Sequence, residues 1–347
     1  MSSDSSNTLS PRESGKYIAE HADHVTIEDA GVETAAKLVL EVVTASSDGR
    51  LGDRFRAHPL HPQTADPAAV DWLFFVTTLN FNFWAPVSST KYGVRYGGEL
   101  YDGYFSLCAA VNRALDEGVP LTDPAYYSQL ELGQLRQLLR SDTETEIPLL
   151  EERLQAATEA GKVLVAKYGG SFAGCLRTAG GSAQRLLRLV TDEFVSYRDQ
   201  ADYKGRRVSF YKRAQLLIAD LWLCFDGQGL GHFDDITSLT MFADYRIPQA
   251  LAYLGALRYS TQLTELLQAE HVFTSGEPME AEIRGCSIEA VERVTAAARR
   301  MLERAGRPAD HARLNSIVVD NFLWGYRRQH VKETDAVPYH KVRCVYY

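Results

Sequence analysis

Apolar residues recur every three or four positions along most of the chain, which is the spacing of one face of an α-helix. In residues 31–44, for example, Val32, Ala35 and Val39 would lie on one such face. The same pattern predicts helices over residues 68–79, 105–115, 132–139, 149–168, 182–194, 211–225, 236–254, 263–267, 287–305 and 314–330. Alternating residues around a Gly-Gly pair at 92–101 predict a short β-hairpin. The fold class is therefore predicted to be mainly α with one small hairpin.

The domain organisation is predicted from changes in composition along the chain. The opening is rich in serine, and residues 1–10 are predicted to be a disordered tail. No internal repeat and no linker-like stretch divides the remainder, so residues 11–347 are predicted to form a single domain. A domain of this size could still be built as two lobes with a cleft between them.

Composition and charge narrow the class of partner. The 347 residues are 45% hydrophobic and 24% charged, as in ordinary globular proteins. The net charge of −8 argues against a protein that grips a nucleic-acid backbone, because such proteins usually carry a basic excess. No apolar run approaches the ~20 residues that span a bilayer, and the polar opening lacks the features of a signal peptide. We therefore expect no stable nucleic-acid partner, no membrane partner and an intracellular protein.

The cysteines and the common catalytic motifs exclude several kinds of chemistry. The five cysteines are odd in number and scattered, which suits reduced thiols, and none forms a CxxC pair that would indicate zinc. The chain has no Gly-x-Ser-x-Gly elbow, no Walker phosphate loop and no His-Glu-x-x-His motif. Any catalysis must therefore rest on other side chains.

Residues 209–257 combine carboxylates, aromatic rings, cations and glycines more densely than packing requires, and we interpret this segment as the active site. Two predicted helices flank a turn at 226–231, whose glycines permit positive φ and a close approach of the backbone to a ligand. The spacing of Gly227, Gly229 and Gly231 is similar to a dinucleotide fingerprint, but no strand precedes it, so we discount that function. A small ligand could bind against this turn.

Several side chains near the turn have both a structural and a functional interpretation. The Asp234 and Asp235 pair stands where a loop meets a predicted helix, and taken alone it is most simply an N-cap. Phe233 could stack a planar base beside these carboxylates, or it could be an ordinary core residue. Asp244 and Arg246 are close enough to form a buried ion pair at a kink. None of these residues decides by itself between structure and catalysis.

Other places along the chain could also contact a ligand. His58 lies in a Pro-rich loop, and the run Asn-Phe-Asn-Phe-Trp at 80–84 could wall a pocket, although such runs are more often core. Asp320 lies in an apolar helix and needs either an arginine or a cationic ligand as its partner. The lysines and arginines within 204–213 could bind one phosphate group. On charge alone, however, they are more simply a run of solvent-exposed charged residues.

Seven sequence blocks resemble the queuosine salvage proteins, the queuosine 5′-phosphate N-glycosylase/hydrolases. They are PRES at 11–14, LNFNFW at 79–84, SLCAAVNRALDEG at 106–118, SFYKRAQ at 209–215, FADYRIPQ at 242–249, EIRGCS at 282–287 and RCVYY at 343–347. The resemblance implies a mainly helical body, similar in fold to helix-hairpin-helix DNA glycosylases. It also implies hydrolysis of the N-glycosidic bond of queuosine 5′-monophosphate, without a metal or cofactor, to release queuine for reinsertion into tRNA.

The resemblance also assigns roles to residues. By position, the family's catalytic aspartate falls on Asp235, its stacking phenylalanine on Phe233 and its base-contacting histidine on His58. Queuine is a 7-deazaguanine, so it lacks the N7 whose protonation helps a purine to leave. Catalysis must then act on the sugar, where a carboxylate can stabilise an oxocarbenium-like transition state and orient or deprotonate water. Asp235 is the residue that we expect to do this.

A second set of residues is expected to bind the base's polar side chain. A ligand-binding carboxylate of the family falls on Asp320, which suits the cationic amine that queuine carries. The family often has Tyr and Asp at the positions of Asn321 and Gly325, so the contacts of these two residues with substrate are expected to differ.

The phosphate is expected to bind Tyr211 and Lys212, with Arg207 as a further candidate. The expected partners are thus the nucleotide and queuine, for a monomer in the cytoplasm or also the nucleus. Two alternatives are a carrier that binds queuine or its nucleotide without catalysis and, against the acidic charge, a repair glycosylase that acts on duplex DNA.

Overall fold

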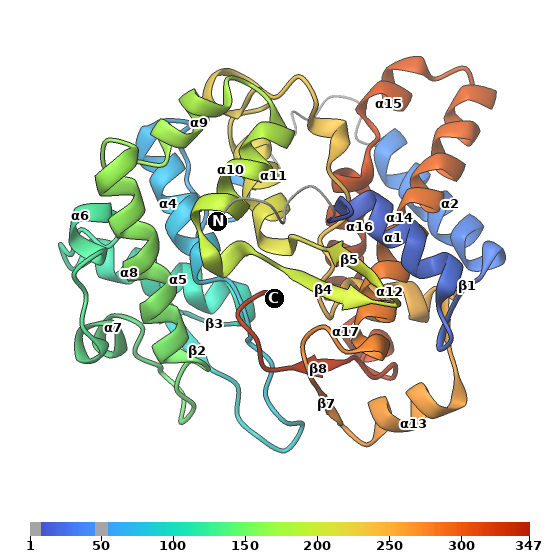
Figure 1. Ribbon diagram of the computed structural model, residues 1–347, viewed down its shortest axis with the longest axis horizontal. Helices are drawn as coiled ribbons and strands as arrows, with labels where there is room; N and C mark the ends of the chain where they lie inside the picture. The colour runs from blue at the N-terminus through green and yellow to red at the C-terminus, as the bar shows by residue number, and fades with distance from the viewer. Residues whose placement is uncertain (1–7, 46–54) are drawn as a thin grey trace. The chain divides into compact units, whose positions relative to one another are not determined.

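The computed structural model describes residues 8–45 and 55–347, and in them the chain is mainly helical, as predicted (Figure 1). Contacts divide the chain into two compact units, each assembled from separate stretches. Of the described residues, the first unit comprises 8–45, 199–215 and 237–343, and the second comprises 55–198, 216–236 and 344–347. Helix α11 (Lys212–Cys224) begins in the first unit and ends in the second.

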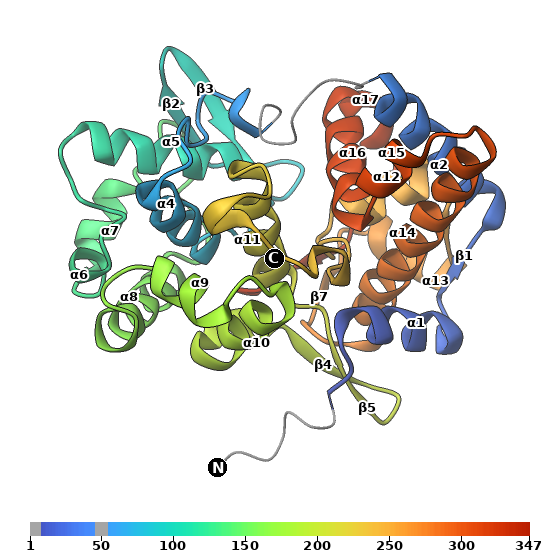
Figure 2. The same cartoon turned by 90° about the horizontal axis from the view of Figure 1, so that it is seen from above.

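The first unit is built around one long helix, α14 (Pro278–Arg304), which packs against α1, α2, α12 and α16 (Figure 2). Its helices are α1 (Pro11–His21), α2 (Asp29–Ala45), α12 (Ile247–Tyr253), α13 (Thr261–Gln268), α14, α15 (Pro308–Arg313), α16 (Ser316–Gln329) and α17 (Val331–Thr334). Among the residues described for this unit, the strands form three separate pairs: β1 (Val25–Ile27) with β6 (Leu257–Tyr259), β4 (Gln200–Tyr203) with β5 (Arg206–Ser209), and β7 (Val272–Phe273) with β8 (Lys341–Val342). The first two pairs are antiparallel and the third is parallel.

Glycine allows α1 and α14 to pack closely. A Cβ atom placed on Gly285 would come within 2.5 Å of the Ile18 side chain, and one on Gly15 would come within 2.7 Å of Ile288. Both separations are too short for non-bonded carbon atoms, so these two positions need glycine. The reciprocal contacts fix α14 against the N-terminal helix.

The second unit is a helical body that carries the predicted hairpin. Strands β2 (Gly93–Tyr96) and β3 (Glu99–Asp102) pair antiparallel, which confirms the hairpin expected at 92–101. The helices are α4 (Pro67–Thr78), α5 (Gly103–Asp116), α6 (Pro124–Tyr127), α7 (Leu132–Leu138), α8 (Leu150–Lys167), α9 (Ala173–Ala179) and α10 (Ala183–Glu193), with 3₁₀ turns η2 (Val195–Tyr197) and η3 (Gly229–Gly231). The aromatic run at 80–84 is buried, as its core interpretation predicts.

Two predicted helices have different bounds in the structure. The helix expected over 236–254 is wrong in its first half, which contains the 3₁₀ turn η4 (Ile236–Ser238) and then chain without regular structure before α12. Asp244 accepts the backbone N–H groups of Arg246 and Ile247 and so starts a new helix there, with a proline in its first turn. The helix expected to begin at Ser287 begins at Pro278 instead, a residue suited to a first turn.

The ends of the chain bear on the other sequence predictions. Of the predicted tail, residues 1–7 lie outside the described residues, whereas Thr8 and Leu9 pair with Arg207 and Ser10 caps α1. No helix among the described residues is long and apolar enough to cross a membrane.

Candidate active site

The carboxylate of Asp235 lies at the N-terminus of α10, in the second unit. One oxygen accepts a hydrogen bond from the Ala183 N–H at 2.5 Å, and the other accepts from the Ser182 hydroxyl at 2.8 Å and the Gln184 N–H at 3.2 Å. Burial opposes ionisation, but these hydrogen bonds outweigh it and hold the pKa of Asp235 below its ordinary value. Asp235 is therefore an anion at neutral pH. It binds the first turn of α10, 52 residues earlier, rather than capping the helix that the sequence predicted after it.

The loop that carries Asp235 is tied to the turn before α10. The Asp234 N–H donates to the carbonyl of Gly181 at 2.9 Å, and the Asp234 carboxylate contacts His232 Nε2 at 2.9 Å. That contact raises the pKa of the exposed His232. Phe233, between them, is 6% exposed. The turn thus places the half-buried Asp235 two residues after a buried aromatic ring.

His58 lies in a second loop of this unit and stacks face to face on an aromatic ring. Its imidazole is 3.7 Å from the ring centre of Phe105, with 3° between the planes. Its Nδ1 accepts the Leu60 N–H at 3.3 Å, so in the neutral ring Nε2 carries the hydrogen. His58 therefore has a fixed ring plane and a donor at Nε2.

The loop around His58 is held by a largely buried histidine, His61. Its Nδ1 donates to the carbonyl of Phe55 at 2.9 Å, and its Nε2 accepts from the Tyr104 hydroxyl at 3.1 Å. Burial is the main cause that lowers the pKa of His61 to about 4. The ring is neutral in the folded protein and fixes the loop by two hydrogen bonds.

We expect His61 to make the protein less stable in mild acid. Between pH 6.5 and about 4, His61 is protonated in the unfolded chain but stays neutral in the folded protein. The free energy of unfolding therefore falls as pH falls through this range. The effect is on the order of 3 kcal/mol. Urea unfolding at several pH values should show this slope, and it should be smaller for His61→Gln. His271→Gln, on an exposed residue, should leave the slope unchanged, and an unchanged slope in His61→Gln would contradict the assignment.

The residues predicted to bind the base's polar side chain lie on α16, in the first unit. Asp320 is 4% exposed, and its carboxylate accepts the Phe242 N–H at 2.9 Å. The sequence predicted an arginine or a ligand as its partner, and the structure adds a backbone donor. Asn321 is exposed, and a Cβ atom on Gly325 would meet no atom within 4 Å. Space is therefore open beside Gly325 for a larger side chain.

The predicted phosphate ligands are also in the first unit, at and before the start of α11. Tyr211 has a left-handed backbone, with φ of +47°, and its hydroxyl accepts a hydrogen bond from the Gln200 amide at 2.5 Å. Lys212 is 7% exposed. Arg207, on β5, pairs with Asp202 at 2.9 Å, which makes it the weaker candidate. The two residues at the helix start are more constrained than this exposed arginine.

The predicted residues thus divide between the units. The second unit carries Asp235, Phe233 and His58, and the first carries Asp320, Asn321, Gly325, Tyr211, Lys212 and Arg207. The sequence predicted an ion pair between Asp244 and Arg246. In the structure the Arg246 guanidinium contacts Asp335 instead, at 3.6 Å.

The residues that hold these groups were not among those predicted from the sequence. Ser182 and the first N–H groups of α10 bind Asp235, and the only local signal was a Gly-Gly-Ser sequence before a helix. Asp199 and Arg284 form a buried ion pair at 2.5 Å in the first unit. Arg284 belongs to the EIRGCS block, which resembled the family without suggesting a role.

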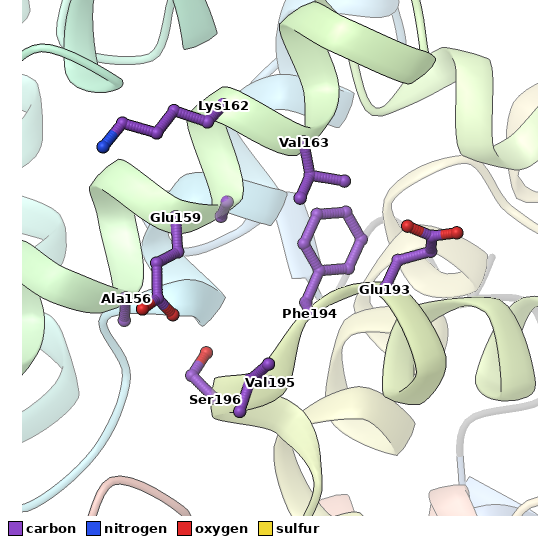
Figure 3. Close-up of a pocket in the computed structure, with 9 residues that line it drawn as sticks. Ala156, Glu159, Lys162, Val163, Glu193, Phe194, Val195 and Ser196 are labelled. Atoms are coloured by element: carbon purple, nitrogen blue, oxygen red, sulfur yellow. The ribbon is translucent and has the colours of Figure 1, made fainter. Parts of the chain in front are cut away.

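A pocket of about 270 Å³ lies elsewhere in the second unit (Figure 3). Residues of α8, including Glu159, Lys162 and Val163, line one side, and Glu193 to Ser196 line the other. None of the predicted site residues lines this pocket. Among the described residues no cluster of three or more His, Cys, Asp or Glu side chains could hold a metal ion.

Comparisons with known proteins identify the family. The family model described as queuosine salvage protein matches residues 60–347. The chain is 46% identical to a Mus musculus protein over 98% of this chain and 99% of the relative, and 36% identical to one from Sphaerobacter thermophilus over 96% of each. Both relatives are named queuosine 5′-phosphate N-glycosylase/hydrolase. The chain therefore belongs to the queuosine salvage protein family.

Proposed function

We propose that this protein hydrolyses the N-glycosidic bond of queuosine 5′-monophosphate and releases queuine. The structural observation that carries the proposal is the Asp235 carboxylate, which three hydrogen bonds hold in its ionised form. A fixed negative charge of this kind stabilises positive charge that develops on a sugar ring. The names of the family's relatives supply the substrate.

In the proposed reaction, the bond between C1′ and the base nitrogen breaks, and its electron pair leaves with the base. Asp235 stabilises the oxocarbenium-like sugar and orients a water molecule toward C1′. The water oxygen bonds to C1′, and the proton that it loses is balanced by protonation of the base nitrogen. The products are queuine and ribose 5-phosphate. The low pKa of Asp235 favours electrostatic stabilisation over strong general-base catalysis.

The remaining residues have proposed binding roles. Phe233 stacks on the base, His58 contacts the base, and Asp320 pairs with the cationic amine. Tyr211 and Lys212 bind the phosphate, with Arg207 as a further cation. We further propose a monomer that uses no metal and acts in the cytoplasm, or also in the nucleus.

The test is base release from three compounds: queuosine 5′-monophosphate, queuosine nucleoside and guanosine monophosphate. Chromatography with mass detection should show queuine from the first at a rate well above the other two. Tight binding of the monophosphate with no base released over many hours would contradict the proposal and support a non-catalytic carrier. Salt-sensitive binding to duplex DNA would instead support the alternative that the protein is a DNA repair glycosylase.

A further inference from the structure

Arg284 is a fully buried charge in the first half of α14 that the proposed reaction does not use. It is 1% exposed and lies in the first unit. Its guanidinium contacts Asp199 through two nitrogens, at 2.9 and 2.5 Å, and Glu280 at 3.3 Å. Both carboxylates are also buried. Burying three charges is costly unless their geometry is well satisfied, so this arrangement requires an explanation beyond helix packing.

One side of the arrangement fixes the start of α11. The backbone carbonyl of Asp199 accepts the N–H groups of Phe210 and Tyr211, at 3.0 and 3.3 Å, and its carboxylate accepts the N–H of Lys212 at 3.1 Å. Three consecutive backbone donors thus bind one residue. The left-handed conformation of Tyr211 is costly for a side chain with a Cβ atom and persists only where neighbours enforce it. Asp199 supplies that constraint.

Arg284 also packs on this segment directly, because its guanidinium lies 4.1 Å from the ring centre of Phe210. The arginine therefore holds Asp199 by charge and Phe210 by stacking. Through these two residues it sets the position of Tyr211 and Lys212.

The other side of Arg284 fixes the chain that holds Asp320. Its Nε donates to the carbonyl of Ala243 at 2.8 Å, and the preceding residue, Phe242, donates its N–H to the Asp320 carboxylate at 2.9 Å. A continuous series of contacts within the first unit thus connects the start of α11 to Asp320, and Arg284 is its centre.

We infer that Arg284 is a positioning residue that sets the spacing between the phosphate ligands, Tyr211 and Lys212, and the carboxylate of Asp320. The inference rests on the proposed function. A nucleotide that carries a phosphate at one end and a cationic amine at the other must satisfy both groups at once. A fixed spacing makes the two contacts cooperative, because neither group of the protein has to be ordered when the ligand binds.

The test compares Arg284→Lys with Glu282→Gln in the full chain. Glu282 is the matched control, since it lies two residues earlier on α14, is 1% exposed, and accepts hydrogen bonds from the Tyr203 hydroxyl and the His24 N–H. Lysine keeps the charge of Arg284 but cannot contact Asp199, Glu280 and Ala243 with one planar fork. Circular dichroism and thermal melting would establish that each variant is folded.

For Arg284→Lys we expect KM for queuosine 5′-monophosphate to rise at least tenfold, with kcat changed much less. The preference for the monophosphate over the nucleoside should shrink, because the phosphate contact is misplaced. Glu282→Gln should lower the melting temperature without changing KM. An Arg284→Lys protein with lowered melting temperature but unchanged KM would show a purely structural role and overturn the inference.

A second variant keeps the inference testable if Arg284→Lys does not fold. Asp199→Asn retains the backbone carbonyl that binds Phe210 and Tyr211, and it weakens the contacts of the side chain with Arg284 and with the Lys212 N–H. The same rise in KM and loss of phosphate preference are expected, and unchanged values would overturn the inference. Failure of the proposed function is distinguishable, because the unaltered protein would then release no queuine from either substrate.

Discussion

Replacing Asp235 with asparagine is expected to lower kcat for queuine release by roughly 10²–10³-fold or more, the usual cost of losing one preorganised electrostatic contact to a transition state. Asparagine has nearly the same shape, but its amide is neutral and cannot stabilise positive charge on the sugar. The variant should still bind queuosine 5′-monophosphate, since its loss falls on the transition state. Single-turnover base release, with binding measured separately by calorimetry, would check both expectations.

The matched control for this change is Asp234→Asn. Asp234 is the neighbouring carboxylate, but it is exposed and contacts His232 rather than the N-terminus of α10. Its loss should change kcat by less than about tenfold if only Asp235 acts on the sugar. Equal losses in the two variants would mean that the negative charge of the whole loop matters, and full activity in Asp235→Asn would refute the proposed mechanism.

Local signals predicted the long helices well. Apolar spacing alone placed α2, α4, α5, α8, α10 and α16 to within a few residues, because each buries one face against its neighbours. The glycine pair at 97–98 likewise indicated the hairpin of β2 and β3, since both residues have positive φ.

The short strands of the first unit could not be predicted in the same way. β1 and β6 have three residues each, and Val25 pairs with Tyr259 from a distant part of the sequence. Segments this short have no measurable alternation, so only the fold reveals them. In the β4 and β5 hairpin the one local signal was Gly205, a single glycine in a turn where the structure shows positive φ at both Lys204 and Gly205.

For the candidate site, the sequence named the residues but not the contacts that hold them. The resemblance selected Asp235, but not its contact with α10, which forms across 52 residues and depends on the fold. In the same way, the sequence identified Asp320 as a carboxylate in need of a partner, whereas its contact with Phe242 also explains why the predicted helix over 236–254 is interrupted. The similarity in fold to helix-hairpin-helix glycosylases stays a prediction.

A second buried arginine, Arg153 on α8, supports the aromatic run at 80–84 in the second unit. It is fully buried, and its guanidinium donates to the backbone carbonyls of Leu79 and Phe81 and, at 2.9 Å through Nε, to that of Pro148. The same group lies 4.4 Å from the ring centre of Phe81. These carbonyls belong to chain outside regular helix or strand, so the arginine satisfies acceptors that secondary structure leaves open.

We expect Arg153→Met to lower the free energy of unfolding by about 3–5 kcal/mol. Methionine fills much of the volume but donates no hydrogen bond, and each buried carbonyl left without a donor costs about 1–3 kcal/mol. Urea unfolding followed by tryptophan fluorescence would measure the loss. Arg136→Met is the matched control, because Arg136 forms an exposed pair with Glu146 that should contribute less than about 1 kcal/mol. If the two variants lost equal stability, the carbonyls around Arg153 would have other donors, and the aromatic run would be held by packing alone.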